Sequence, residues 1–257
     1  DANDAEAICE AVGRPNMRFV PIKSVEQQAV CSLHTGRQFL VGQRTALINH
    51  CRGLLAEFGI IMPLGADKVR RLFAKILADE NTSVPLFLKD LLQQHLQDLA
   101  RNEQRIESID KQLTAWAKTN HQATTLLQML GVGVITATAF AAGVCDAKSF
   151  DNGRQFSAWI GLVPRQYSSG GKNKLGSITK AGDVYLRTML AQGARSIVFN
   201  AKKKSDPFSL WIKRLLERAG MNKTVIAVAA KQARIMWAIM AKNQDYQPER
   251  ICSPLSA

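Results

Sequence analysis

The sequence lacks the features that mark disulfide-rich, zinc-binding and membrane-spanning proteins. Its five cysteines are odd in number and include no C-x-x-C pair, and its four histidines are scattered along the chain. A disulfide scaffold and a structural zinc site are therefore not expected. No apolar run approaches the roughly 20 residues that a bilayer requires, the longest candidate being residues 134–144. No signal peptide is recognisable, so we expect a cytoplasmic, nucleoid-associated protein without a membrane partner.

Positive charge is what the sequence has in excess, and it is concentrated in one half of the chain. The 257 residues contain 34 Lys and Arg against 21 Asp and Glu, a formal net charge of +13. Residues 1–120 are nearly neutral, whereas residues 121–257 hold 19 basic and 7 acidic side chains. Concentrated positive charge favours a polyanionic partner, and nucleic acid is the commonest one. A basic surface that serves solubility alone is the alternative.

Helix and turn signals divide the chain into three blocks, which we expect to be residues 1–22, 23–119 and 120–257. The first block predicts a short helix over residues 5–12. It then predicts an extended exit, because Pro21 disfavours the helical conformation in the residue before it.

The second block has the pattern of a coiled-coil hairpin. One helix is expected to begin near Ser24, with Gln27 in the capping-box position, and a basic helix over residues 66–78 is expected at the tip. Apolar residues recur at seven-residue steps in both long helices: Leu33, Leu40, Leu47 and Leu54, and then Leu92, Leu99, Ile106 and Leu113. His95 lies in the second seam, where we expect a satisfied interface residue rather than a metal ligand. Pairing within one chain and pairing between subunits fit the pattern equally.

The third block opens with an apolar helix expected over residues 124–130. Gly131-Val132-Gly133 and a small-residue helix over residues 134–142 follow. This is the layout of a helix–hairpin–helix element, in which glycines let a phosphate approach the amides of the next helix. A plain turn between two packed helices is nearly as good an interpretation. An amphipathic helix over residues 223–241 is expected to close the core.

A glycine-rich stretch in the third block is the most informative segment. It contains Ser168, Ser169 and three glycines, and nine basic residues lie between positions 165 and 204 against the single acid Asp183. Backbone amides of such a loop can approach a phosphate, and neighbouring cations neutralise its charge. The candidate nucleic-acid-binding residues are Arg165, Lys172, Lys174, Lys180, Arg187, Gly131 and Gly133. A flexible surface loop is the local alternative.

Two further features indicate chemistry. Asp1 and Asp4 are three residues apart at a helix start, so both carboxylates lie on one helix face. Carboxylates placed in this way can hold Mg²⁺, although acids are also ordinary at helix starts. Ser169 is a candidate nucleophile, but the nearest histidine in sequence is His121, so a Ser-His arrangement is not indicated. Its activation would come from a metal or from neighbouring cations.

Several motifs together resemble the transposases of the "one-ten" insertion-sequence family and the related Piv-type DNA invertases. The opening Asp-Ala-Asn-Asp-Ala resembles the segment that supplies the last two acids of the family's DEDD site. The most specific match is Gly-Leu-x-Pro-Arg-x-Tyr-x-Ser-Gly over residues 161–170. It is followed by Ile-x-Lys-x-Gly-Asp-x-x-Leu-Arg over residues 178–187.

The resemblance implies a fold, a reaction and partners. The fold is mainly α: a remnant of an α/β RuvC-like domain, a coiled-coil hairpin and a helical transposase domain. Asp1 and Asp4 would hold Mg²⁺, and Ser169 would attack a DNA phosphodiester to form a phosphoserine intermediate. A non-coding guide RNA would pair with donor and target DNA, and the protein would form a homo-oligomer. The family's first Asp and its Glu do not occur here, which predicts an N-terminally truncated chain.

Two other classes of function fit parts of the sequence. The chain could be a non-catalytic nucleic-acid-binding protein built on the glycine turn and the basic face, or a coiled-coil assembly module. Site-specific inversion, rather than insertion, is the alternative within the resemblance.

Overall fold

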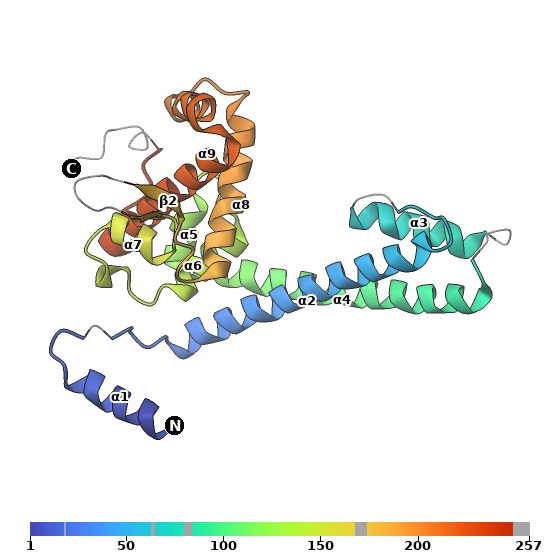
Figure 1. Cartoon of the computed structure of the whole chain (residues 1–257), viewed down its shortest axis with the longest axis horizontal. Helices are drawn as coiled ribbons and strands as arrows, with labels where there is room; N and C mark the ends of the chain where they lie inside the picture. The colour runs from blue at the N-terminus through green and yellow to red at the C-terminus, as the bar shows by residue number, and fades with distance from the viewer. Residues whose placement is uncertain (18, 63–64, 80–83, 168–173, 249–257) are drawn as a thin grey trace.

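A computed structural model of the chain describes residues 1–17, 19–62, 65–79, 84–167 and 174–248. These residues are mainly helical, as the sequence predicts, and include two short strands. A long helical pair extends from a compact helical body, and the N-terminal helix α1 (Ala2–Gly13) lies apart from the body (Figure 1). Helix α1 begins earlier than the expected residue 5 and has no buried residue.

The long pair consists of α2 (Val25–Ala56) and α4 (Leu86–Thr119), which run antiparallel, with α3 (Ala66–Ala78) near their far end (Figure 1). The predicted capping box is confirmed: Ser24 Oγ accepts a hydrogen bond from the Gln27 amide, and the Gln27 side chain accepts one from the Ser24 amide. Helix α3 has the predicted bounds. Residues within three positions satisfy these backbone amides at the start of α2. The start of this helix could therefore be predicted from the sequence alone.

The seam of this pair forms within one chain. The heptad residues of α4 are all buried, namely Leu92, Leu99, Ile106 and Leu113. In α2, however, Cys51 and Leu55 are fully buried whereas Leu54 is only partly covered. Leu54 packs against this cluster as the expected stripe requires, but the most deeply buried residues at this end lie beside it. A straight α-helix has 3.6 residues per turn, so a strict seven-residue step drifts off the contact face.

His95 is not the satisfied residue that the sequence analysis expected. Its buried Nε2 atom has no hydrogen-bond partner in the described part of the chain. Its ring meets the ring of His50 edge-on, with 5.4 Å between centroids. Burial, and then the neighbouring His50, lower the pKa of His95, so the structure favours its neutral form.

The body is built from five helices around one core, with a 3₁₀ turn η1 (Ala147–Ser149). They are α5 (His121–Leu127), α6 (Val134–Gly143), α7 (Gly153–Trp159), α8 (Val184–Ala201) and α9 (Pro207–Lys242). Phe140, Phe156 and Met236 are fully buried at its centre. Helix α5 begins three residues before the expected start, because the Asn120 side chain caps it by accepting from the Ala123 amide.

Helix α9 differs most from expectation. It begins at Pro207, after the cap residue Asp206, and not near residue 223. Its path bends at Gly220, whose φ of 74° and ψ of 174° are not helical. Of the described helices it alone is long and apolar enough to cross a bilayer, contrary to the expectation of no such run. Half of that apolar stretch is buried in the fold, where Val228, Ala229 and Met236 belong to the core.

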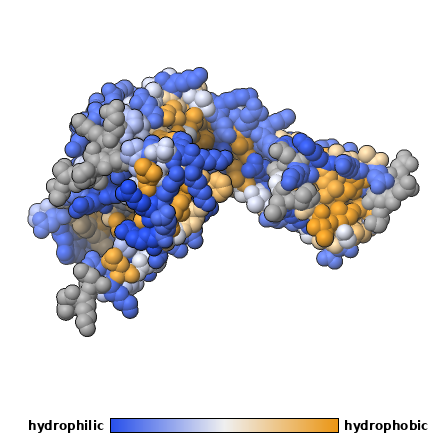
Figure 2. Space-filling view, turned by 90° about the horizontal axis from the view of Figure 1, so that it is seen from above, coloured by the Kyte–Doolittle hydropathy of each residue, from blue (hydrophilic) through white to orange (hydrophobic). Residues whose placement is uncertain are grey.

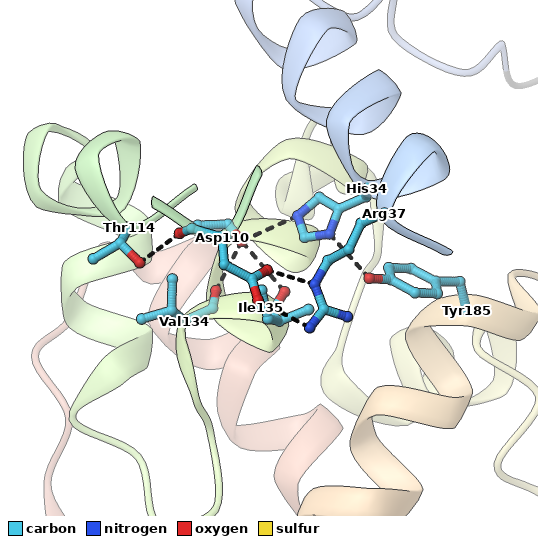
Figure 3. Close-up of polar contacts among 8 residues, drawn as sticks. His34, Arg37, Asp110, Thr114, Val134, Ile135 and Tyr185 are labelled. Carbon is cyan, nitrogen blue, oxygen red and sulfur yellow. Dashed lines mark hydrogen bonds and ion pairs between the residues drawn. The ribbon is translucent and has the colours of Figure 1, made fainter. Parts of the chain in front are cut away.

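A buried histidine joins the helical pair to the body (Figure 3). His34 of α2 is 4% exposed and contacts two other helices. Its Nδ1 lies 3.0 Å from Tyr185 Oη of α8, and its Nε2 lies 3.0 Å from Thr138 Oγ1 of α6. Beside it, Arg37 makes a two-bond ion pair with Asp110 of α4, with Nε–Oδ1 and Nη2–Oδ2 distances of 2.5 and 3.2 Å.

The hydrogen-bond pattern determines which nitrogen of His34 carries the proton. Thr138 Oγ1 donates its proton to the Val134 carbonyl at 2.7 Å, so it accepts from His34 Nε2–H. Nδ1 is then the acceptor for the Tyr185 hydroxyl. Burial, followed by the charge of Arg37, lowers the pKa of His34 to about 4, against the opposing effect of Asp110. The folded chain therefore holds His34 neutral.

This network predicts a specific acid sensitivity. Since the pKa of His34 is about 4 in the folded chain and 6.5 ordinarily, the unfolded chain binds more protons between these values. Stability should thus fall as pH drops from 6.5 to about 4, by about 2–3 kcal/mol in all. His34→Gln keeps a donor and an acceptor but does not titrate. Urea unfolding across this pH window should show a shallower loss for the variant; equal slopes would contradict the assignment.

Candidate nucleic-acid interface

The predicted glycine-rich segment spans a β-hairpin. Strands β1 (Pro164–Gln166) and β2 (Leu175–Ile178) pair antiparallel, and the Tyr167 amide donates to the Lys174 carbonyl at 2.8 Å. Ser169 and Lys172 belong to the connection between them and lie outside the described residues. The sequence analysis missed both strands. The signal that could have found them is the pair of glycines, Gly170-Gly171, between Gln-Tyr and Leu-Gly-Ser-Ile.

Two glycines let the backbone cross itself at the base of this hairpin. Gly161 and Gly182 have φ angles of 80° and 70°, which side chains other than glycine rarely adopt. A Cβ on Gly182 would lie 1.9 Å from the Trp159 carbonyl oxygen, and one on Gly161 would lie 2.3 Å from the Ala181 carbonyl oxygen. The segments that enter and leave the hairpin are therefore in direct backbone contact.

Arg187 ties the two sides of this crossing together. Its Nη1 donates to the Ile160 carbonyl at 3.0 Å and to the Ala181 carbonyl at 2.7 Å. The residue is 9% exposed. The sequence analysis expected Arg187 to be a nucleic-acid-binding cation; as placed, the guanidinium is buried and satisfies carbonyls of the crossing. It is a positioning residue for the hairpin rather than an exposed phosphate ligand.

The other predicted cations of the hairpin face solvent. Arg165, Lys174 and Lys180 are exposed, and Lys180 adopts a left-handed φ of 56° directly before the crossing. Asp183, the acid nearest to them in sequence, caps α8 by accepting from the amides of residues 185 and 186 at 2.7 and 3.0 Å. Because that carboxylate is engaged with a helix start, the three side chains present a local excess of positive charge.

The glycines of the predicted helix–hairpin–helix turn have different roles. The turn does join two packed helices, α5 and α6. Gly131 has a φ of 75°, and a Cβ there would lie 2.7 Å from the Ile197 side chain of α8. A Cβ on Gly133 would meet nothing within 4 Å. Close packing against α8 is thus sufficient to explain why position 131 is a glycine. Gly133, directly before α6, has no such packing constraint.

The predicted acids lie elsewhere. Asp1 is the N-cap residue of α1 without a side-chain cap bond, and Asp4 follows in the first turn; both are exposed. Figure 1 shows α1 well away from strand β2. In the described ranges no group of three or more His, Cys, Asp or Glu side chains could hold a metal ion. The described chain therefore does not bring the Asp pair together with the basic hairpin.

Fold and site together define a mainly helical protein that gathers positive charge around a backbone-clamped β-hairpin. Comparison with known proteins narrows this class. Residues 123–209 match the model of the Transposase IS116/IS110/IS902 family. The match includes the turn, the hairpin, the crossing and α8.

Known transposases align with nearly the whole chain. A "Probable family 20 transposase" of Pseudomonas aeruginosa is 46% identical over 96% of this chain and 74% of the relative. The "Transposase for insertion sequence element IS1111A" of Coxiella burnetii is 44% identical over 96% of this chain and 68% of that protein. The chain belongs to the IS116/IS110/IS902 family of insertion-sequence transposases. A "Pilin gene-inverting protein" of Moraxella bovis is 27% identical over 49% of the chain and 39% of that protein.

The crossing predicts a sharp contrast between two glycine substitutions. Gly182→Ala would force a Cβ into the Trp159 carbonyl at a positive φ, so it should lower the free energy of unfolding by more than about 3 kcal/mol. Gly42→Ala lies within α2, where a Cβ meets nothing within 4 Å, and should raise it by about 0.5–1 kcal/mol. Urea unfolding measures both. Similar stabilities for the two variants would contradict the crossing.

Proposed function

We propose that this transposase chain cuts and rejoins DNA through a phosphoserine intermediate formed at Ser169. The observation that supports this role is the clamped hairpin. The Tyr167–Lys174 hydrogen bond and the crossing at Gly182 hold both ends of the segment that carries Ser169. Preorganised positioning of a nucleophile is a large part of what a recombinase must supply.

The chemistry is a transesterification that conserves the number of phosphate ester bonds. Ser169 Oγ forms a bond to phosphorus while one bond from phosphorus to a deoxyribose oxygen breaks. The serine proton passes to solvent, and the leaving oxygen takes one up. A hydroxyl of the partner strand then attacks the phosphoserine, which rejoins DNA and frees the serine. In this proposal the exposed cations Arg165 and Lys174 stabilise the negative charge that develops on the phosphate.

Asp1 and Asp4 fit the chemistry of a Mg²⁺ ligand pair. Both are exposed acids one helical turn apart, and Mg²⁺ is commonly held by one or two carboxylates together with waters and substrate phosphates. When bound, the ion would neutralise phosphate charge and make a serine hydroxyl or water easier to deprotonate. In the proposed complex the carboxylates of α1 hold that ion, and the hairpin holds the serine.

Nucleic acids are the proposed partners of the basic body. Residues 121–257 hold 19 basic and 7 acidic side chains, which suits backbone contacts to donor DNA, target DNA and a guide RNA that reads sequence by pairing. Inversion is the second candidate function, because a pilin gene-inverting protein aligns with half of this chain. Binding of nucleic acid without catalysis is the remaining alternative.

Adjacent serines provide a matched test of the nucleophile. The substrate is a nicked DNA that traps covalent intermediates, and the protein includes any reading frame upstream of codon 1 that encodes the two further acids. Ser169→Ala should abolish the SDS-resistant protein–DNA adduct, because no hydroxyl remains to form the phosphoester. Ser168→Ala should retain it. Both variants should bind DNA with affinities within about twofold of the parent, since neither removes a charge.

Each other outcome of this test has a definite meaning. An adduct that persists in Ser169→Ala but disappears in Ser168→Ala would move the nucleophile by one residue. Adducts in both variants would reject a serine in this segment. DNA binding without adducts or strand exchange in any form, the parent included, would favour the non-catalytic alternative.

Self-association through the helical pair is also part of the proposal. The seam between α2 and α4 is filled within one chain, so a second copy would need another surface. Figure 2 shows an apolar area near the far end of the pair. Among the exposed large apolar residues, Ile61 is 89% exposed, Leu86 79% and Phe87 78%. Exposed apolar surface indicates a protein contact.

This surface predicts which substitutions dissociate the oligomer. Leu86→Ser with Phe87→Ser should shift sedimentation velocity from oligomer to monomer while helix content is unchanged, because both side chains are exposed. Leu99→Asp should instead unfold the pair, since Leu99 is 2% exposed within one chain. An oligomer that survives the double substitution would place the contact elsewhere.

A further inference from the structure

A cavity lies beside the hairpin, on the face turned toward α7 and the second half of α9. Its volume is about 710 Å³, which is the range of small-molecule sites. Residues from α7, from the start of β1 and the segment before it, from β2 and from α9 line it. It therefore shares strand β2 with the segment that carries Ser169.

An unpartnered hydroxyl lies in the wall of this cavity. Ser157 of α7 lines it and is 2% exposed. Its Oγ atom is buried and has no hydrogen-bond partner in the described residues. Buried hydroxyl groups are normally hydrogen-bonded, so this wall of the cavity contains an unsatisfied polar group, although the Oγ atom has almost no exposed surface in the free protein.

Positive charge is concentrated at the same place. Arg154, Lys223 and Arg234 line the cavity, and its lining includes no carboxylate. The Arg234 Nε donates to the Ala230 carbonyl at 3.3 Å, which leaves the outer nitrogens of the guanidinium for other partners. Burial, and then the charge of Arg154, lower the pKa of Arg234. An anion between the two guanidiniums would relieve this repulsion.

Gly153 brings these two cations together. It is buried at the start of α7, and a Cβ there would lie 3.1 Å from the Cα, Cβ and carbonyl oxygen of Arg234. The main chain of α7 therefore rests directly on α9 at Arg234, and Arg154 follows as the next residue. Close backbone packing, rather than a flexible surface, sets the spacing of the pair.

The remaining walls are mainly apolar, with Ser177 and Asn222 as their polar side chains. Leu162, Ile178 and Ile226 line the cavity together with alanines of α9. One side of the site thus suits an anion and the other a flat or apolar group. A single nucleotide combines these properties in its phosphate and its base, and a double helix is too wide to enter a cavity of this size.

We infer that this cavity holds one unpaired nucleotide of a nucleic-acid strand, with its phosphate between Arg154 and Arg234, near Ser157, and its base against the apolar wall. The inference rests on the proposed function, because the strand is one that the basic hairpin engages. It adds a specific site for an unpaired residue beside the reacting segment. Single-stranded DNA and RNA share this chemistry, and the experiment compares them.

The test measures binding of the whole chain to a fluorescent single-stranded DNA, an RNA of the same sequence and the DNA duplex. Arg154→Gln and Arg234→Gln should each weaken binding to at least one single strand by about tenfold and change duplex affinity far less. Arg218→Gln, which removes an exposed charge from α9 outside the cavity, is the matched control. The thermal unfolding temperature should not fall in Arg234→Gln, because the substitution removes a repulsion between like charges.

A second variant tests the cavity without altering charge. Ala227→Trp fills it from the α9 wall and should abolish the fluorescence change of a 2-aminopurine placed in the preferred strand, while circular dichroism shows an intact fold. If the three cavity variants weaken single strand and duplex equally, or none of them weakens either, the cavity is not a nucleotide site. The stronger single-strand effect, on DNA or RNA, identifies the source of the nucleotide.

Variants of the hairpin cations distinguish a failure of this inference from a failure of the proposed function. Arg165→Gln and Lys174→Gln should weaken single-stranded and duplex DNA alike and reduce the salt dependence of binding by about one charge each. Salt-independent binding of the parent would reject the nucleic-acid function itself. If the hairpin variants weaken binding as expected and the cavity variants do not, only the proposed nucleotide site in the cavity is rejected.

Discussion

The backbone crossing between residues 159–161 and 180–182 is the constraint on which the candidate site depends. It requires two glycines at positive φ and one buried arginine, Arg187, which satisfies a carbonyl on each side. The proposed nucleophile and its neighbouring cations belong to the hairpin that this crossing supports, whereas the proposed Mg²⁺ ligands, Asp1 and Asp4, lie at the start of α1. The exposed cations and the Ser169 segment extend from it, and the cavity shares β2. A large polar side chain at the base of a small hairpin is retained here because it replaces hydrogen bonds that the two carbonyls would otherwise lack.

The crossing is also connected to the long helical pair. Asp183, directly after Gly182, caps α8, and the second residue of that helix is Tyr185, whose hydroxyl donates to His34 of α2. The residue that caps α8 at the base of the hairpin therefore lies two positions before the tyrosine that bonds to the joint of the pair; Figure 3 shows the joint. The joint combines an apolar cluster built around Val30, Leu113 and Ala142 with the neutral histidine and the arginine–aspartate pair. Directional hydrogen bonds of this kind define the angle between the long helical pair and the body.

The features that could be predicted from the sequence are those determined by residues close together in the chain. The capping box at Ser24, the bounds of α3 and the heptads of α4 were predicted correctly, because a few neighbouring residues determine them. At the end of α2 the predicted Leu54 packs against the core, but Cys51 and Leu55 are buried more deeply, and that difference depends on how two helices drift against each other. The hairpin strands were missed, as was the His34 network, whose partners are 104 and 151 residues away in sequence. Ser169 was singled out by resemblance, and it stays a prediction.

A count of basic residues does not show which of them can contact a phosphate. The basic excess of the second half is real as a sum, but the structure divides it among different tasks. Arg187 is buried and satisfies two carbonyls, so it adds little to an exposed field. Arg154 and Arg234 both line the cavity, and the charge of Arg154 adds to burial in lowering the pKa of Arg234. Arg165 and Lys174 are exposed on the hairpin, where Arg165 Nη2 also donates to the Thr179 carbonyl at 3.4 Å. A count treats all five as equal, whereas their burial and their contacts with carbonyls decide which of them are open to a phosphate, and the proposed nucleotide site would use the two that line the cavity beside β2.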